Sequence, residues 1–296
     1  GRGAGMSRTL GTVVSRHDVL GKYGAEILRL LCSSVDYRED IRYSDGVVNR
    51  LVDAYRRIRN TCRYLLGNLH DFTPEAALPL AELDPLDRFA LDLANAAHQR
   101  ITEAYREYEF HKVFHTLHNL CVTDLSAFYL DILKDRLYSF APGSRERRSA
   151  QTALWNILQL IMRDMSPVMS FTAEEVFQSL PDGLKPGAVT VFATREPDLS
   201  GLDFGADERK AWEALLAVRN EVTRAIEPLR KAGEVGHALD TSVTIYADEA
   251  LLATLKGLET DLRALFIVSQ LALEPLSGAP AGAAQAEELE GLEIGV

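Results

Sequence analysis

The stretch Ser44–Asn68, SDGVVNRLVDAYRRIRNTCRYLLGN, decides the fold. Its apolar side chains recur every three or four residues, at Val48, Leu51, Tyr55, Ile58, Cys62 and Leu65. That spacing places them along one side of an α-helix and leaves polar and basic residues on the other sides. The stretch therefore predicts a long amphipathic helix whose apolar face is buried against other helices.

Helical patterns with short connections continue on both sides of this stretch. They cover Ser15–Ser34, residues 85–120, Asp124–Tyr138, Ser144–Pro167 and residues 172–181. A Pro/Gly-rich stretch follows, and then a helix is expected over residues 208–231. The rest of the pattern indicates a strand at residues 241–246, a helix at 249–265, a second strand at 266–273 and a last strand at 291–296. We expect a mainly α fold, a helical bundle with a small α/β appendage at its C-terminal end.

The composition excludes several classes of protein. Of 296 residues, 47% are hydrophobic and 25% charged, which rules out a disordered tail, a collagen-like fibre and a disulfide scaffold. Three scattered cysteines indicate a reducing compartment, and no apolar run approaches the ~18–20 residues of a membrane span. We therefore expect a cytoplasmic protein without a membrane segment.

The net charge of −11 argues at face value against a nucleic-acid partner. The charge is uneven, however: residues 1–60 carry +4, residues 61–150 carry −3 and residues 151–296 carry −12. The basic end of the chain is therefore the part that could face a polyanion.

Two groups of basic residues are candidates for binding phosphates. Arg56, Arg59 and Arg63, with Asn60 beside them, fall within about 60° of one another on the 44–68 helix. Such a ridge could grip phosphates, or it could be a solvated face paired with carboxylates. Arg147 and Arg148 begin another helix, where positive charge opposes the helix dipole and hints at an external anion.

A metal site on the histidine-rich helix is the less favoured interpretation. His111, His115 and His118 have spacings that could hold a metal from one helix face. Each lies one residue from the apolar stripe of that helix, and no thiolate is near in sequence. We expect boundary residues there, and no metal.

Several segments resemble one enzyme family. Gly5–Val14, GMSRTLGTVV, resembles the Lys-Met-Ser-Lys-Ser signature loop of class I aminoacyl-tRNA synthetases, with Gly5 and Arg8 at the two lysine positions and Thr12 where asparagine is usual. The sequence downstream resembles bacterial isoleucyl-tRNA synthetases at the same spacing, in Lys22–Leu30, Ser34–Arg42, Ala54–Leu69, Asp124–Tyr138, Arg147–Thr152 and Ser170–Glu175.

The resemblance implies a C-terminal fragment of such an enzyme, which forms isoleucyl-adenylate from ATP and transfers isoleucine to its tRNA. Its catalytic core would precede the loop, so the fragment alone would be inactive. The implied division is residues 1–43 as signature loop and connecting helices, 44–183 as anticodon-binding bundle, 184–207 as linker and 208–296 as C-terminal helix with an α/β subdomain.

Partners and site residues follow from the same resemblance. ATP with Mg²⁺ would contact Met6, Ser7, Arg8 and Thr9, and isoleucine tRNA would contact the two arginine groups. Zinc in the whole enzyme would lie beyond Val296. We expect a monomer. The alternative is a stand-alone, degenerate synthetase-like protein that binds RNA or another partner without aminoacylation.

Overall fold

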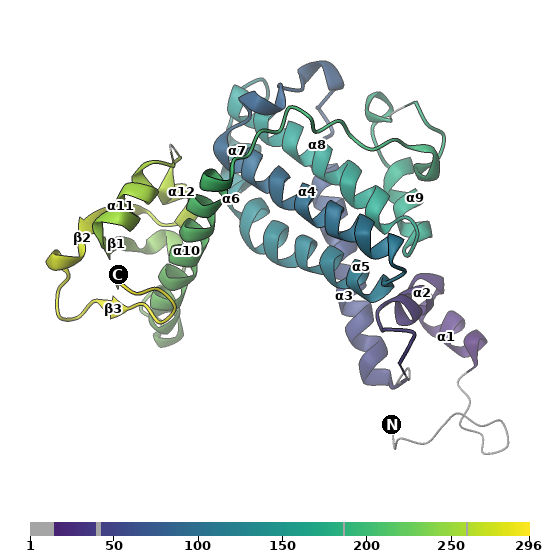
Figure 1. Ribbon diagram of the computed structural model, residues 1–296, viewed down its shortest axis with the longest axis horizontal. Coiled ribbons are helices and arrows are strands. Elements are labelled where there is room, and N and C mark those ends of the chain that lie inside the picture. The colour runs from purple at the N-terminus through teal and green to yellow at the C-terminus, as the bar shows by residue number, and fades with distance from the viewer. Residues whose placement is uncertain (1–14, 40–42, 186, 259) are drawn as a thin grey trace. The chain divides into compact units, whose positions relative to one another are not determined.

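The computed structural model describes residues 15–39, 43–185, 187–258 and 260–296. They divide into two compact units at the Leu202–Asp203 boundary, which falls inside the stretch expected as a linker. The first unit is helical and the second combines helices with a small sheet (Figure 1). The expected fold class, mainly α with a C-terminal α/β appendage, is confirmed.

The helical unit is built on long helices that pack side by side. Helix α4 packs along α8 and α5, while α3 packs against α2, α8 and the segment after α5 (Figure 1). Leu91, Ile101, Leu154 and Ile161 between them are fully buried. The helices of this unit are α1 (Arg16–Tyr23), α2 (Ala25–Ser33), α3 (Asp45–Gly67), α4 (Pro85–Arg106), α5 (Phe110–Asn119), α6 (Leu130–Ile132), α7 (Lys134–Ser139), α8 (Arg145–Met165) and α9 (Ser170–Gln178).

The helix predicted for the 44–68 stretch corresponds to α3. Ser44 caps it by accepting a hydrogen bond from the Val47 N–H. The apolar stripe is buried as its spacing predicts, with Val48, Ile58 and Leu65 fully covered. This burial turns the basic residues of α3 away from the core.

The single helix predicted over residues 85–120 was wrong, because the chain breaks between α4 and α5. Tyr108 adopts a left-handed backbone with φ of 57°, which ends α4, and α5 then packs back along it. The break predicted near residue 122 does not occur. There a π-helix, Leu120–Tyr129, continues α5, and the Cys121 carbonyl accepts the hydroxyls of Ser126 at 2.7 Å and Thr61 at 3.3 Å.

The second unit places a four-stranded sheet against α10 (Ala206–Ala232), which contains Pro228 without ending there. The strand order is β2-β1-β4-β3, with β1 and β2 parallel and the other pairs antiparallel. The predicted 249–265 helix is split at Gly257, and Ile267 in a left-handed backbone delays the second strand. The remaining elements are β1 (Ser242–Ala247), α11 (Glu249–Lys256), α12 (Leu262–Phe266), β2 (Gln270–Pro275), β3 (Ala284–Gln285) and β4 (Leu292–Gly295).

A buried carboxylate fixes the last loop of this unit. Glu221 on α10 is almost completely buried and accepts the backbone N–H groups of Glu287 and Glu288. Arg224 contacts both Glu221 and Glu287. These contacts balance the charge of Glu221 and attach the segment before β4 to α10.

In the helical unit, a buried histidine attaches the segment after α9 to the bundle. His98 on α4 lies between two carboxylates, with Nδ1 2.6 Å from Asp164 Oδ1 and Nε2 2.7 Å from Glu196 Oε1. The contact with Asp164 raises the pKa of His98 above its ordinary value, and Glu196 adds to the effect although burial opposes it. The segment is also held by Arg163, which donates to the Thr194 carbonyl.

Folding raises the pKa of His98, so the protonated imidazole stabilises the folded state. This contribution to the free energy of unfolding should be complete below the unfolded-state pKa of about 6.5, and it should be lost as pH rises through the folded-state pKa. The free energy of unfolding should therefore fall more steeply as pH rises above about 6.5 in the wild-type chain than in His98→Gln. Urea denaturation at a series of pH values measures this. Parallel pH profiles for the two proteins would contradict the assignment.

Candidate nucleic-acid interface

Helix α3 presents the predicted arginine ridge to solvent. Arg56, Arg59, Asn60 and Arg63 are all exposed, and the apolar stripe beside them is buried. Their common side of the helix follows from spacings of three, four and seven residues. The structure thus brings these four residues onto one surface of the helical unit.

The members of the ridge differ in their partners. Arg59 forms an ion pair with Glu175 on α9, and this hydrogen bond raises the pKa of Arg59. Arg56 lies 3.9 Å from Asp53, and its side chain is 72% exposed. Among the described residues, Arg63 forms no ion pair. The Arg56–Asp53 pair is weak, because both side chains are exposed and the distance between their charged atoms is long. Arg56 and Arg63 are therefore the guanidiniums of the ridge that are most available to an external anion.

Arg147 and Arg148 lie in a different environment. Arg147 is 6% exposed and donates to both carboxylate oxygens of Asp71, at 2.5 and 3.0 Å, and to the Leu137 carbonyl. Arg148 donates to the Asp71 carbonyl and to Gln151. Positive charge at the start of α8 is unfavourable because of the helix dipole, and the carboxylate of Asp71, within the chain, offsets this effect. Arg147 thereby lowers the pKa of Asp71 to about 2. The predicted contacts of Arg147 and Arg148 with tRNA remain a prediction, and both side chains already have partners within the chain.

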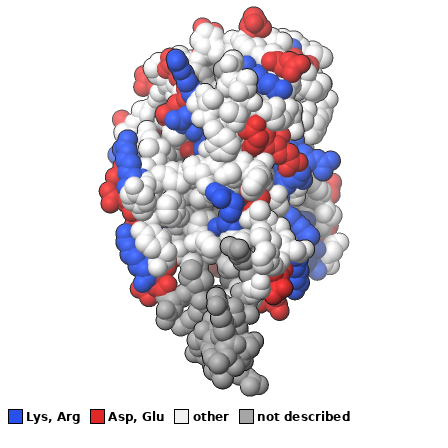
Figure 2. All heavy atoms as spheres, turned by 90° about the vertical axis from the view of Figure 1, so that its right-hand side faces the viewer, with Lys and Arg blue, Asp and Glu red and all other residues white. Residues whose placement is uncertain are grey.

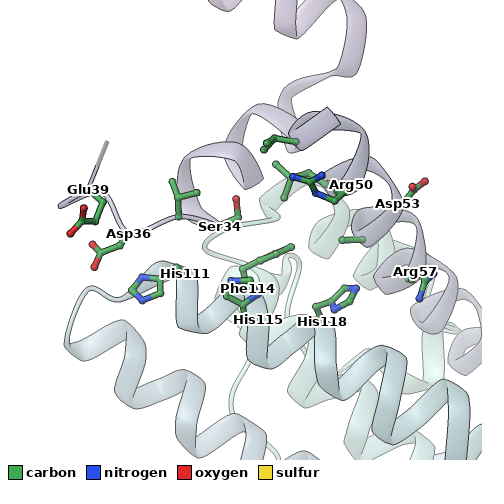
Figure 3. A pocket seen from close by; sticks show the side chains of 14 residues that line it. Ser34, Asp36, Glu39, Arg50, Asp53, Arg57, His111, Phe114, His115 and His118 are labelled. Atoms are coloured by element: carbon green, nitrogen blue, oxygen red, sulfur yellow. The ribbon is translucent and has the colours of Figure 1, made fainter. Parts of the chain in front are cut away.

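A groove between α3 and α5 was not predicted from the sequence. It has a volume of about 860 Å³, and its rim carries Arg50 and Arg57 from α3 and His111, His115 and His118 from α5 (Figure 3). Asp36 and Glu39 lie beside His111 at one end, while Arg57 and His118 lie at the other (Figure 3). The seven-residue spacing of the arginines and the three- and four-residue spacings of the histidines are the sequence signals that could have revealed it.

Burial lowers the pKa of both His115 and His118 below the ordinary histidine value. A charge effect from His111 adds to this at His115, and one from Arg57 adds to it at His118. Both imidazoles are therefore mainly neutral at pH 7. Within the described part of the chain, no three His, Cys, Asp or Glu side chains are placed to hold a metal ion together.

The face in Figure 2 shows how the charges are distributed on one side of the molecule. Lys and Arg side chains are scattered among acidic and uncharged ones and do not form one continuous basic field. On this face, binding of a polyanion would depend on particular arginines. None of the described helices has the length and apolar character needed to cross a membrane.

The signature-loop residues Met6, Ser7, Arg8 and Thr9 lie outside the described residues. Their expected contact with ATP remains a prediction. The contacts of Arg56, Arg59, Asn60 and Arg63 with tRNA likewise remain predictions.

The fold and this surface define a helical bundle that carries an exposed arginine ridge and an attached α/β unit. Residues 87–245 match the anticodon-binding domain of tRNA ligase, and the chain belongs to that family.

Three relatives are similar over the whole chain. It is 63% identical to an isoleucine–tRNA ligase of Nitratidesulfovibrio vulgaris, 57% identical to one of Desulfovibrio desulfuricans and 52% identical to one of Lawsonia intracellularis. In each comparison all of this chain is covered, and it spans 32% of the relative's length.

The Arg147–Asp71 contact should be important for stability. Arg147→Ala should lower the free energy of unfolding by about 2–3 kcal/mol, because it removes the hydrogen bonds of a buried guanidinium to the partly exposed Asp71 and to the Leu137 carbonyl. The exposed neighbour Arg145, 2.9 Å from Asp84, is a matched control, and Arg145→Ala should cost less than about 1 kcal/mol. Chemical denaturation measures both. Equal effects of the two substitutions would refute this role for Arg147.

Proposed function

We propose that this chain is the tRNA-binding portion of an isoleucine–tRNA ligase and that its helical unit binds the anticodon stem-loop of isoleucine tRNA. The match of residues 87–245 to an anticodon-binding domain carries this proposal. The names of the relatives, and their similarity along the whole chain, support isoleucine as the amino acid.

The α3 ridge supplies the chemistry such a contact needs. Guanidinium groups donate two parallel hydrogen bonds to a phosphate and keep their charge at any physiological pH. Asn60 beside them offers an amide that can donate to and accept from a base or ribose. Arg59 would act chiefly by keeping the ridge in place, because it is already bound to Glu175 on α9.

In the whole ligase, isoleucine and ATP, the latter as its Mg²⁺ complex, would form isoleucyl-adenylate before transfer to the tRNA. We assign Met6, Ser7, Arg8 and Thr9 to the ATP phosphates, with Arg8 supplying a positive charge. The chain spans only 32% of the length of its relatives, so we propose that the chemical steps need residues outside it. Such an enzyme would work in the cytoplasm.

The double substitution Arg56→Ala/Arg63→Ala should weaken binding of isoleucine tRNA. Each lost phosphate contact should also reduce the slope of log affinity against log salt by about one. Filter binding of transcribed isoleucine tRNA to the 296-residue chain at several salt concentrations measures both quantities.

Arg106→Ala is the control, since this arginine is 71% exposed, belongs to the same unit and pairs with Glu103. Its affinity and salt slope should match those of the wild type. Wild-type affinity and slope in the double variant would place the tRNA contact elsewhere. Failure of the wild-type chain to prefer isoleucine tRNA over another tRNA would refute the proposed specificity.

A further inference from the structure

The groove between α3 and α5 has a chemistry that the arginine ridge lacks. It combines two permanent cations, Arg50 and Arg57, with imidazoles that can gain a charge, His115 and His118 (Figure 3). Among the described residues neither arginine forms an ion pair. The groove thus offers guanidinium donors that no carboxylate of the described chain occupies.

Phe114 positions the two imidazoles at the groove. Its ring centroid lies 5.2 Å from that of His115 and 6.1 Å from that of His118. Phe114 itself is 6% exposed and belongs to the buried face of α5. A core side chain therefore supports both histidines, which restricts their motion and reduces the entropy lost when they bind a ligand.

Two of the acidic residues that line the groove, Asp36 and Glu39, lie away from its basic end. Asp36 and Glu39 lie next to His111 at the opposite end, and Asp53 is associated with Arg56 at 3.9 Å (Figure 3). The end formed by Arg57 and His118 is the part suited to an anion. Arg57 adds to the effect of burial in lowering the pKa of His118, and an anion between the two side chains would oppose the effect of Arg57.

The spacing of the cations favours a strand of phosphates over a single ion. Arg50 and Arg57 are separated by two turns of α3, about 10.5 Å along the helix axis. Two guanidiniums so placed can each bind a different phosphate of one backbone. The ridge residues Arg56 and Arg63 are on the same helix, so a bound strand could contact both surfaces of α3.

We propose that the α3–α5 groove holds backbone phosphates of the bound tRNA through Arg50 and Arg57, and that protonation of His115 and His118 strengthens this contact. The proposal rests on the proposed function, since it takes tRNA as the ligand of the helical unit. It adds a second contact surface and makes tRNA affinity depend on pH. Phosphate binding and imidazole protonation are linked equilibria. A bound phosphate makes protonation of the imidazole more favourable, and the protonated imidazole in turn binds the phosphate more tightly.

The sign of the pH dependence follows from the groups that face the imidazoles. In the free protein His111 disfavours protonation of His115, and Arg57 and His115 disfavour protonation of His118. The other charged residues that line the groove are Arg50, Asp36, Glu39 and Asp53. In the free state burial is the main cause that lowers the pKa of both histidines. A phosphate should raise both pKa values again. Affinity should therefore increase as pH falls from 7.5 to 5.5.

The test is the affinity of the 296-residue chain for isoleucine tRNA at fixed ionic strength between pH 5.5 and 7.5. The wild type should bind roughly three- to tenfold more tightly at the lower pH. His115→Gln/His118→Gln should remove most of this gain. Arg50→Gln/Arg57→Gln should weaken binding roughly tenfold or more at every pH.

Matched controls separate the groove from general effects of charge. His70→Gln removes a histidine whose side chain is 71% exposed and lies outside the groove, and it should keep the wild-type pH profile. Asp53→Asn removes the carboxylate nearest the basic end and should strengthen binding. Circular dichroism at both pH values checks that each variant is folded.

Three results would overturn the proposal. If Arg56→Ala/Arg63→Ala weakens tRNA binding while all groove variants behave as wild type, the groove is not a contact but the proposed function stands. If inorganic pyrophosphate binds and Arg50→Gln/Arg57→Gln abolishes only that binding, the groove serves a free anion. If the wild-type chain binds no tRNA, the groove proposal and the proposed function both fail.

Discussion

The arrangement of the helical unit depends on one buried carboxylate, Asp87, in the first turn of α4. It is fully buried and accepts hydrogen bonds from Tyr129 at 2.8 Å, Arg136 at 2.8 Å and Ser149 at 2.6 Å. These partners belong to the π-helical segment, α7 and α8. Burial raises the pKa of Asp87, and Arg136 opposes this. A charge in that position is tolerated only where such donors surround it, so Asp87 specifies how four segments meet.

That constraint has consequences for the candidate site. Helix α4 is held against α8 at its first turn, and it ends before Tyr108. Helix α5 therefore packs back along α4, and its histidine face lies toward α3. Thr61 of α3, bonded to the Cys121 carbonyl and within 3.1 Å of Ser126, attaches α3 to the same segment. The groove is therefore bounded by helices that the core fixes on both sides.

Periodicity predicted the helical bundle and the exposure of Arg56, Asn60 and Arg63, because burial of an apolar stripe determines which way the other side chains face. It could not predict that Arg147 is bound to Asp71, since those residues are 76 positions apart and their pairing depends on how helices pack. The break at Tyr108 was also missed. No glycine or proline marks it, and the left-handed Tyr108 is part of a local turn in which the Glu109 N–H donates to the Ala104 carbonyl at 2.7 Å.

The net charge of −11 is compatible with a polyanion as ligand once positions are considered. Several arginines bind acidic groups of the chain itself, as Arg147 does with Asp71, and a phosphate would have to compete with those carboxylates for them. The arginines of α3 differ because they lie beside a stripe that is buried in the core. Among the described residues, Arg50, Arg57 and Arg63 are exposed and form no ion pair, and Arg56 is exposed with only a 3.9 Å pair to Asp53. Since electrostatic attraction in salt solution acts over about 8–10 Å, these local charges determine binding more than the distant excess of acid does.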